Sequence, residues 1–414
     1  MSSLTPTEIG SGHEGNIRDQ ITAYGQRLKN GEMGALPAVI ALLALVVLFA
    51  SLSPFFLTTL NFANLFVQAA QLTVLASALV FVLLLAEIDL SAGVTAGVGM
   101  ALFVVLNQMM GINWIIAIIA ALALGSLVGW TIGIFVAKIG VPSFVVTLGL
   151  FLGFQGLMLV MLGDGGLYRL DIPELKAIMN NNMPVAGGWI MLAIMVIVSL
   201  GLGFYDRARR AKAGVANRPI ALMLSRVALI AILGGIAVGA MSVNRSVSVV
   251  PIEGVPIVIP IVIGILFVGT FVLDRTTFGR HLYAVGGNPE AARRAGIKVA
   301  KIRITSFIIC STLAVVSGVL AASRIGAIES TAGRSIVLSG VAAAVVGGVS
   351  LFGGRGRLIH AAIGALVIAI IDNGLGLIGL PAGVNFLVTG AVLIAAATID
   401  ALSRKRSGGG GRMV

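Results

Sequence analysis

The sequence predicts an all-α polytopic membrane protein, a helical bundle of about 10–12 transmembrane helices with broken or re-entrant segments. Hydrophobic residues make up 58% of the 414 positions and charged residues only 11%, whereas soluble domains carry about 25% charged residues. Apolar runs long enough to cross a bilayer follow one another along the chain. The 54 glycines allow helices to pack closely and to break within the membrane.

The chain divides into an N-terminal segment, a transmembrane domain over residues 36–402 and a short tail. Residues 1–35 contain acidic residues and no apolar core, so we expect a cytoplasmic segment rather than a signal peptide. An apolar helical stripe in this segment fits either an amphipathic helix on the membrane surface or local packing. The stripe consists of Ile17, Ile21, Tyr24 and Leu28. The Gly-rich residues 403–414 are expected to form a flexible cytoplasmic tail.

Within the transmembrane domain, the apolar runs predict twelve crossings. They lie at residues 36–56, 64–107 (two helices, interrupted by EIDLSAG), 113–137, 142–162, 188–204, 220–241, 255–273, 304–322, 336–351, 358–377 and 384–402. If the stretches around Glu87 and Gly353 are re-entrant, the number falls to ten or eleven.

Lys and Arg cluster between the apolar runs and give the chain a formal net charge of +12. They gather in two loops, at about 206–219 and 274–303, and again after residue 403. The positive-inside rule places these segments in the cytoplasm, together with both termini. The charge therefore records orientation in the membrane, and we expect no nucleic-acid partner.

Acidic side chains interrupt the second long apolar run. An ionisable residue at the bilayer centre costs about 2.5–3.5 kcal/mol on insertion scales, so Glu87 and Asp89 require an explanation. Asp89 or Ser91 is placed to cap the helix that follows. One interpretation is a structural turn at the inner interface, and the other is a broken helix that lines a solute path.

A second break is predicted at residues 345–356, the Gly-rich VVGGVSLFGGRG around Ser350. Its GVSLFGG resembles EIDLSAG when the leucines are aligned, which suggests a two-fold internal repeat. In a later apolar helix, Asp372 and Asn373 place a carboxylate and an amide in the membrane. These two side chains either bond to a neighbouring helix or contact a hydroxyl-rich solute.

The sequence contains no motif for an energy source or for catalysis. The Walker A motif requires a Gly-Lys pair, and none occurs. HExxH and CxxC are also absent, and the single cysteine, Cys310, is expected to be a small packing residue. We therefore expect no enzymatic activity, no metal site and no cofactor bound by this chain. If ATP drives it, another polypeptide hydrolyses the nucleotide.

The stretch GGNPEAARRAGI, residues 286–297, predicts a short, capped, basic helix. Its candidate residues are Asn288, Pro289, Glu290, Ala291, Ala292, Arg293, Arg294, Ala295 and Gly296. Asn288 is a preferred N-cap, Pro289 suits the first helical position, and Gly296 ends the helix in a left-handed conformation. Such a short helix is unstable alone, so it packs either against its own bundle or against a cytoplasmic motor domain whose motion it transmits.

Four blocks of the sequence resemble the permease subunits of bacterial ATP-binding-cassette importers for monosaccharides. They are AEIDLSAG, VPSFVVTLG, RTTFGRHLYAVGGNPEAARRAGI and DNGL. The length, with an extra helical pair around the basic residues 206–218, is most similar to the xylose-type permease. Ala86 departs from the family pattern, in which a Gly usually stands before the acidic position.

The resemblance implies both a function and its partners. It implies a homodimer of this chain in the inner membrane, ATPase subunits that use ATP and Mg²⁺, and a periplasmic binding protein that delivers a monosaccharide. The short helix at residues 288–296 then couples the ATPase to the bundle. The candidates for the translocation path are Glu87, Asp89, Ser91, Ser350, Asp372 and Asn373.

Two other functions are compatible with this composition. One is an ion- or proton-coupled secondary carrier of a small polar solute that uses Glu87, Asp89 and Asp372. Such relays place carboxylates in mid-span on several helices, whereas these acids lie near breaks or helix ends, which favours the importer. The other is a structural or channel subunit.

Overall fold

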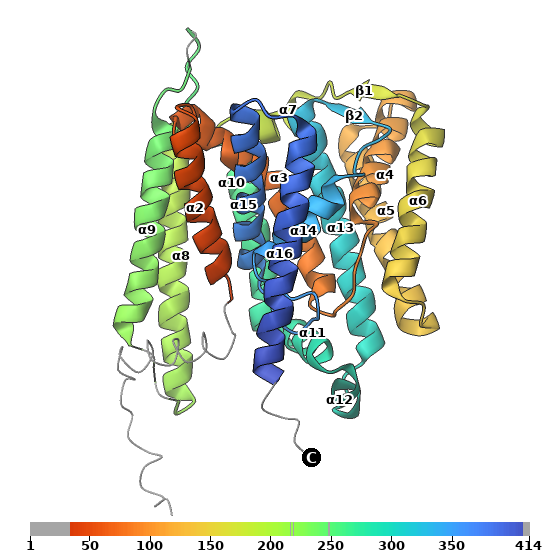
Figure 1. Cartoon of the computed structure of the whole chain (residues 1–414), viewed down its shortest axis with the longest axis vertical. Coiled ribbons are helices and arrows are strands. Elements are labelled where there is room, and N and C mark those ends of the chain that lie inside the picture. The colour runs from red at the N-terminus through yellow and green to blue at the C-terminus, as the bar shows by residue number, and fades with distance from the viewer. Residues whose placement is uncertain (1–33, 216, 218, 247–248, 409–414) are drawn as a thin grey trace, which may run out of the picture. The chain divides into compact units, whose positions relative to one another are not determined.

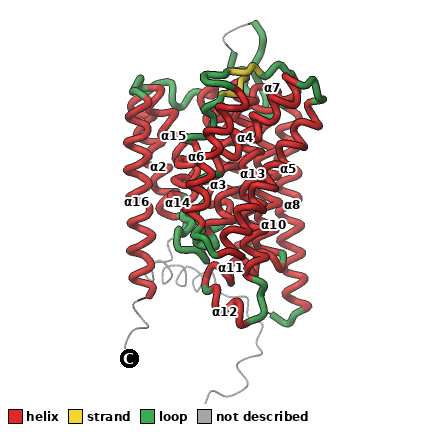
Figure 2. Tube along the Cα trace, turned by 90° about the vertical axis from the view of Figure 1, so that its right-hand side faces the viewer, coloured by secondary structure: helices red, strands yellow, loops and turns green. Residues whose placement is uncertain are grey.

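The computed structural model describes residues 34–215, 217, 219–246 and 249–408, which are almost entirely helical (Figures 1 and 2). The chain forms two compact units. The described part of the first, the hairpin unit, lies within Met183–Val255, and the second, the bundle unit, covers Met33–Asn182 and Pro256–Gly408. The fold is therefore the expected all-α polytopic architecture. The N-terminal stripe and residues 409–414 lie outside the described residues.

The bundle unit contains most of the helices and one small antiparallel sheet. Its elements are α2 (Leu36–Leu52), α3 (Thr59–Leu83), α4 (Ala92–Val104) continued by the π-helical η2 (Val105–Met109), α5 (Trp114–Ile134) continued by η3 (Phe135–Ile139), α6 (Ser143–Leu162), β1 (Leu167–Arg169), α7 (Pro173–Asn180), α10 (Val258–Arg275), α11 (Thr277–Gly287), α12 (Pro289–Arg294), α13 (Val299–Ile325), β2 (Ala327–Glu329), α14 (Ile336–Val346), α15 (Leu358–Leu377) and α16 (Ala382–Gly408).

Ten helices in the described part of the chain are long and apolar enough to cross a membrane, at the lower end of the expected range. Two shorter apolar helices, α2 and α14, account for the difference from twelve. The 11 residues of α14 extend about 16 Å, roughly half of a hydrocarbon core. The expected span over residues 336–351 is therefore wrong: a half-helix ends at Gly347 and Gly348, where the chain takes a left-handed conformation at Gly348 (φ 102°).

Non-helical backbone brings the chain to the start of this half-helix. Gly93, in the first turn of α4, lies directly against Gly333. A Cβ added to Gly93 would come within 2.3 Å of the Gly333 carbonyl oxygen. One turn further along, an added Cβ on Gly97 would come within 2.8 Å of the Ala332 carbonyl oxygen. The first turn of α4 is buried in the bundle, whereas Leu338 in the first turn of α14 is exposed. Non-helical backbone against the end of a buried helix occurs in the broken helices of transporters.

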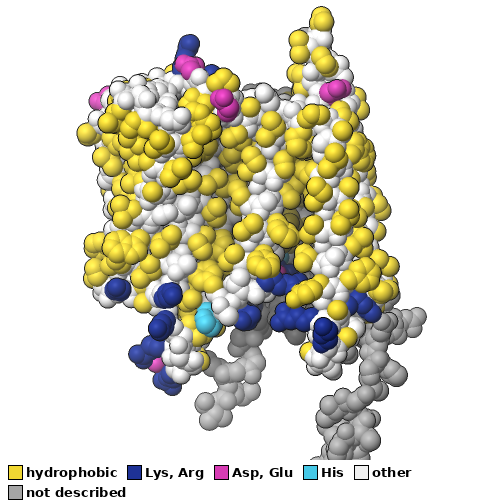
Figure 3. Space-filling model, turned by 180° about the vertical axis from the view of Figure 1, so that it is seen from behind, with side chains coloured by type: hydrophobic (Ala, Val, Ile, Leu, Met, Phe, Trp, Pro, Cys, Tyr) yellow, Lys and Arg dark blue, Asp and Glu magenta, His cyan; other side chains and the backbone are white. Residues whose placement is uncertain are grey.

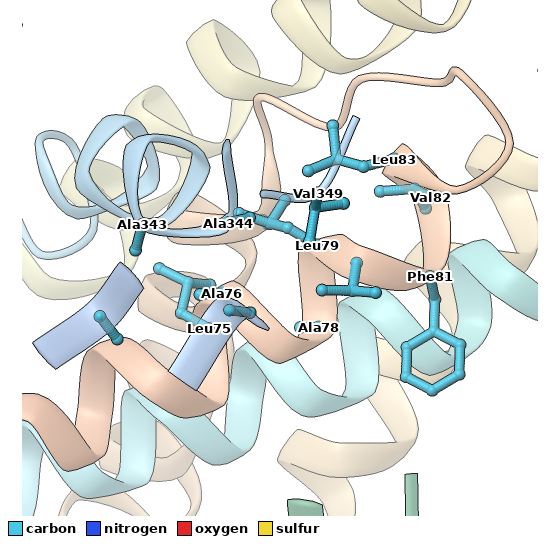
Figure 4. Close-up of a cluster of buried hydrophobic side chains, with 14 of the residues drawn as sticks. Leu75, Ala76, Ala78, Leu79, Phe81, Val82, Leu83, Ala343, Ala344 and Val349 are labelled. Carbon is cyan, nitrogen blue, oxygen red and sulfur yellow. The ribbon is translucent and has the colours of Figure 1, made fainter. Parts of the chain in front are cut away.

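Helix α3 forms the centre of the bundle unit. Its C-terminal half is almost continuously buried, and Leu75 and Leu79 pack against α14 near Ala343 and Ala344 (Figure 4). Small residues also let α15 approach α14 closely. A Cβ added to Gly364 of α15 would come within 1.8 Å of the Ala343 carbonyl oxygen of α14. Close packing of this kind replaces the hydrophobic effect as the main attraction between helices in lipid.

The small sheet joins the loop after α6 to the loop after α13. The positive-inside rule assigns both loops to the same side of the membrane. Strands β1 and β2 pair in the register Leu167↔Glu329. They lie at the end of the bundle unit opposite α12 (Figures 1 and 2). Lys and Arg side chains gather at the α12 end (Figure 3), and the exposed basic residues there include Arg280, Arg293, Arg294, Lys298 and Lys301. The charge asymmetry between the two ends is the one that the sequence predicts.

The hairpin unit consists of α8 (Val185–Lys212) and α9 (Ile220–Ser242). Leu192 of α8 packs onto Gly234, and Gly203 lies against Met223 of α9. At the end remote from the connecting loop, Arg245 donates to the Gly254 carbonyl over 3.0 Å. This unit is the extra helical pair expected around the basic residues 206–218.

Helix α16 continues to Gly408, into the segment that was expected to be a flexible tail from residue 403. A helix that a membrane span has already nucleated adds further residues at little cost. Gly408 is the first of four consecutive glycines, a residue of low helix propensity.

A stripe of glycines on α5 brings this helix against the backbone of α13. Gly125, Gly129 and Gly133 recur at intervals of four, and an added Cβ on Gly129 would come within 2.3 Å of the Phe307 carbonyl oxygen.

We predict that Gly129→Val separates the two helices and abolishes recovery of monodisperse protein from membranes, measured by size-exclusion chromatography. Gly149→Val is the control, because an added Cβ there meets nothing within 4 Å. Equal recovery of both variants would contradict the packing.

Candidate functional site

The first break begins where α3 ends at Leu83. The N–H groups of Leu85, Ala86 and Glu87 bond back to carbonyls of Val82 and Leu83 at 2.9–3.1 Å. Ala86 has φ 60°, the only positive value at a non-glycine residue in the described chain. An L-residue in this conformation costs about 1 kcal/mol relative to glycine. Ala86, where the resemblance implies a glycine, therefore has a backbone conformation that glycine would adopt without strain.

Two hydroxyl side chains of α6 hold the backbone of the first break. The Ile88 N–H donates to Ser143 Oγ over 3.2 Å, and Thr147 Oγ1 donates to the Ile88 carbonyl over 3.3 Å. Both residues belong to VPSFVVTLG, one of the four blocks that resemble the importer permeases. The signal that could have identified them is a pair of hydroxyls at i and i+4 in an otherwise apolar helix, which puts both on one face.

Asp89 and Ser91 are buried completely and bond to each other. Asp89 Oδ1 accepts from the Ser91 N–H over 2.9 Å and from Ser91 Oγ over 2.6 Å. Asp89 thus binds the chain where α4 begins, as expected, whereas the Ser91 hydroxyl does not cap the helix. The Cys310 thiol of α13 donates to Asp89 Oδ2 over 3.7 Å, so the cysteine has a polar contact in addition to its packing role. In this conformation neither Asp89 nor Ser91 faces a solvent path.

The second break meets the first directly. The Gly354 N–H donates to the Leu84 carbonyl over 2.9 Å, and the Ser350 N–H donates to the Arg355 carbonyl over 2.9 Å. The Ser350 hydroxyl donates to Asp400 Oδ2 of α16 over 3.0 Å. The two breaks that the sequence predicts separately therefore form one structure, in which each supplies a backbone partner that a bilayer cannot.

Helix α11 packs onto both breaks through its last residues. An added Cβ on Gly286 would come within 1.8 Å of the Leu84 carbonyl oxygen and 2.9 Å of the Gly354 nitrogen. Tyr283 of the same helix donates its hydroxyl to the Gly356 carbonyl over 2.7 Å. Burial and the nearby Asp274 carboxylate raise the pKa of Tyr283 to about 12, so this donor keeps its proton. We call this meeting of residues 84–88, 283–287 and 353–356 the junction.

The short basic helix α12 leaves the junction through Asn288, which is both the end of α11 and the N-cap of α12. Asn288 Oδ1 accepts from the Ala291 N–H over 2.9 Å, Pro289 occupies the first helical position, and Gly296 has φ 83°. The predicted capping is thus confirmed. Ala292 is the buried contact of this helix with the bundle.

The charged face of α12 is exposed and internally paired. Glu290 accepts from Arg293 over 2.9 Å and from Arg294 over 3.3 Å. Hydrogen bonds from these arginines lower the pKa of Glu290, and the hydrogen bond and charge of Glu290 raise the pKa of Arg293. The side chains keep 52–79% of their surface exposed, which leaves this face available to a partner.

An ion pair forms a second connection between this region and the first break. Arg303, in the first turns of α13 just beyond α12, lies 3.3 Å from Glu87 Oε1, and their side chains are only 27% and 12% exposed. Glu87 therefore balances a cation instead of standing free in lipid. Motion of α12 can reach the first break through the backbone contacts of Gly286 and through this pair.

Asp372 and Asn373 lie apart from the junction, on α15. Asn373 and Asn61 of α3 exchange two amide hydrogen bonds of 2.8 and 3.0 Å. This pairing corresponds to the interhelical alternative for Asn373. Asp372 is exposed on the surface of the unit. Contact of any of the six path candidates with a solute stays a prediction.

Comparison with known proteins identifies the kind of protein that carries this junction. A family model described as "Branched-chain amino acid transport system / permease component" matches residues 61–170 and 175–397. The chain belongs to this family. It is therefore a transport subunit and a multi-pass membrane protein.

Individual relatives align with most of the length of this permease. The xylose transport system permease protein XylH of Escherichia coli is 32% identical over 92% of this chain and 95% of its own. XylH of Haemophilus influenzae is 33% identical over 85% and 91%. The ribose import permease protein RbsC of Escherichia coli is 30% identical over 88% and 92%. No solved structure matches the permease.

The strained position Ala86 gives a test of the first break. We predict that Ala86→Gly raises the free energy of unfolding by about 0.5–1 kcal/mol, because the gain in the left-handed region exceeds the added entropy of the unfolded chain. The measurement is the thermal midpoint in detergent. Ala78→Gly, in the interior of α3, is the control and should lower the midpoint. A lower midpoint for both variants would show that Ala86 is not strained.

Proposed function

We propose that this permease is the membrane-spanning subunit of an ATP-driven importer that translocates a monosaccharide, a xylose-type pentose or a related sugar. A periplasmic binding protein delivers the sugar, and partner ATPase subunits bind and hydrolyse ATP with Mg²⁺, because this chain contains no Walker A motif. The subunit acts as a homodimer in the inner membrane, with α12 and both termini in the cytoplasm. The names of the XylH and RbsC relatives support the sugar class.

The observation that carries this proposal is the continuous connection from α12 to both helix breaks. The helix is exposed, capped and too short to be stable without a partner surface. Gly286 of α11, which leads into α12, lies against the Leu84 carbonyl, and this carbonyl also accepts from Gly354 of the second break. A displacement of α12 therefore moves the backbone where α3 and α14 end.

The proposed mechanism follows from this connection. ATP binding closes the partner ATPases and displaces α12, and the junction transmits the displacement to α4, which follows the first break, and to the half-helix α14, which precedes the second. These helices are the elements whose rearrangement would open one side of the path and close the other. The nucleotide state shifts the equilibrium only if the ATPase contacts α12 differently in the two conformations.

Two of the three carboxylates that a proton-coupled carrier would use, Glu87 and Asp89, are engaged by other protein groups. Glu87 pairs with Arg303, and Asp89 accepts two hydrogen bonds from Ser91.

A direct test of the importer against the carrier is sugar uptake in cells after ATP depletion or after addition of an uncoupler. We expect uptake to stop on ATP depletion and to survive the uncoupler while ATP is maintained. The reverse result would replace the importer with the carrier.

We predict that Glu290→Lys lowers sugar uptake at least tenfold while the protein still inserts into the membrane. The substitution removes both ion pairs of α12 and places a cation at the positive end of the helix dipole. Uptake of labelled sugar and the amount of protein in the membrane fraction are measured together. Asp171→Lys is the matched control, since Asp171 is an exposed acid at the opposite end of the bundle unit with 80% of its side chain accessible. Normal uptake and ATPase stimulation with Glu290→Lys would exclude α12 as the coupling element.

A further inference from the structure

The hairpin unit contains a cavity that the transport function does not use. It lies between α8 and α9, next to the loop that joins them, and has a volume of about 240 Å³. Every residue that lines it belongs to the hairpin unit, which folds as a compact unit of its own.

The lining of this cavity is basic on one side and apolar on the other. Three arginines, Arg207, Arg210 and Arg226, line it together with one acid, Asp206. Within the described chain, the guanidinium groups of Arg210 and Arg226 have no ion-pair partner. The apolar side is formed by residues such as Leu202, Met223 and Val227. The cavity therefore offers a positive head and an apolar wall.

The length of α8 places these arginines at the depth of lipid headgroups. The helix has 28 residues, or about 42 Å, which exceeds a hydrocarbon core of about 30 Å. Trp189 and Tyr205 are exposed near its two ends, where aromatic side chains mark the membrane interfaces. Arg207 and Arg210 follow Tyr205 directly and so lie just outside the hydrocarbon.

The beginning of α9 adds further positive potential. This helix of 23 residues starts after Pro219, has no side-chain N-cap and has no acidic residue in its first turn. Pro219 and Leu222 line the cavity, so the free N–H groups and the positive end of the helix dipole lie beside it. Arg226 lies in the second turn of the same helix, so its guanidinium adds to this positive potential.

We propose that this cavity binds the headgroup of an anionic phospholipid from the leaflet that faces the basic loop. The phosphate accepts hydrogen bonds from Arg210 and Arg226, and an acyl chain lies along the apolar wall. A free phosphate satisfies the arginines but leaves that wall empty, whereas a lipid satisfies both. Basic cavities between membrane helices on the cytoplasmic side are suited to such headgroups.

The test is a lipid titration of the purified full-length protein in detergent, with phosphatidylglycerol as the probe. Thermal midpoint and the number of bound lipids in native mass spectra are recorded. We expect Arg210→Gln/Arg226→Gln to weaken the apparent affinity at least about tenfold, since each cation near a phosphate contributes about a factor of five. Arg209→Gln is the matched control, because Arg209 is an exposed arginine in the same last turn that does not line the cavity.

Three results would overturn the proposal. The double variant could retain as much phosphatidylglycerol as the wild type, or Arg209→Gln could lose as much as the double variant, which would indicate unspecific attraction. Equal stabilisation by glycerol 3-phosphate or by phosphatidylcholine would exclude the anionic lipid as the occupant. If the double variant does not fold, Arg226→Gln alone and Arg210→Lys/Arg226→Lys replace it, with loss expected in the first and retention in the second.

Discussion

A hydrogen bond between two helix breaks, from the Gly354 N–H to the Leu84 carbonyl, is the contact around which the bundle unit is organised. A bilayer supplies no water to unpaired backbone groups, so a broken helix persists only where protein atoms satisfy them. Each break here uses polar atoms from other segments for this purpose. Ser143 and Thr147 of α6 bind Ile88, and Tyr283 of α11 binds Gly356. The breaks are therefore built into the packing.

The same constraint explains why glycine occurs where these segments meet. Gly286 and Gly354 bring the backbones of α11, the first break and the second break into direct contact, and a Cβ on Gly286 would overlap the Leu84 carbonyl. Close backbone contact is stiff, because no flexible side chain lies between the elements. A helix attached to this contact, as α12 is through Asn288, would move the breaks with little loss of displacement. This stiffness is the physical basis of the proposed coupling.

The hairpin unit follows a different design. Its two helices carry mostly exposed apolar side chains and bury few residues. Its polar atoms are concentrated at the two ends, around Arg245 at one and in the basic cavity at the other. The proposed lipid site makes this unit sensitive to membrane composition, whereas the bundle unit contains the proposed path and the proposed coupling helix. The hairpin unit therefore depends mainly on contacts with lipid, whereas the bundle unit depends mainly on contacts between its own helices.

The sequence by itself determined the membrane class, the positions of most helices, the capped helix at residues 288–296 and the presence of two breaks. These features depend on local properties: apolar length, glycine content and capping chemistry within a few residues. The sequence also pointed to Ala86 as an unusual position, although only the backbone conformation showed why.

Tertiary structure decided what the polar residues do. That the two breaks touch each other, that Glu87 pairs with Arg303 and that Asn373 pairs with Asn61 could not be read from the chain, because each contact joins segments separated by more than two hundred residues. Hydropathy left open whether residues 336–351 span the membrane or form a re-entrant segment, and the structure shows the half-length helix α14. Pairing at long range depends on how the helices pack, and a local pattern carries no information about that.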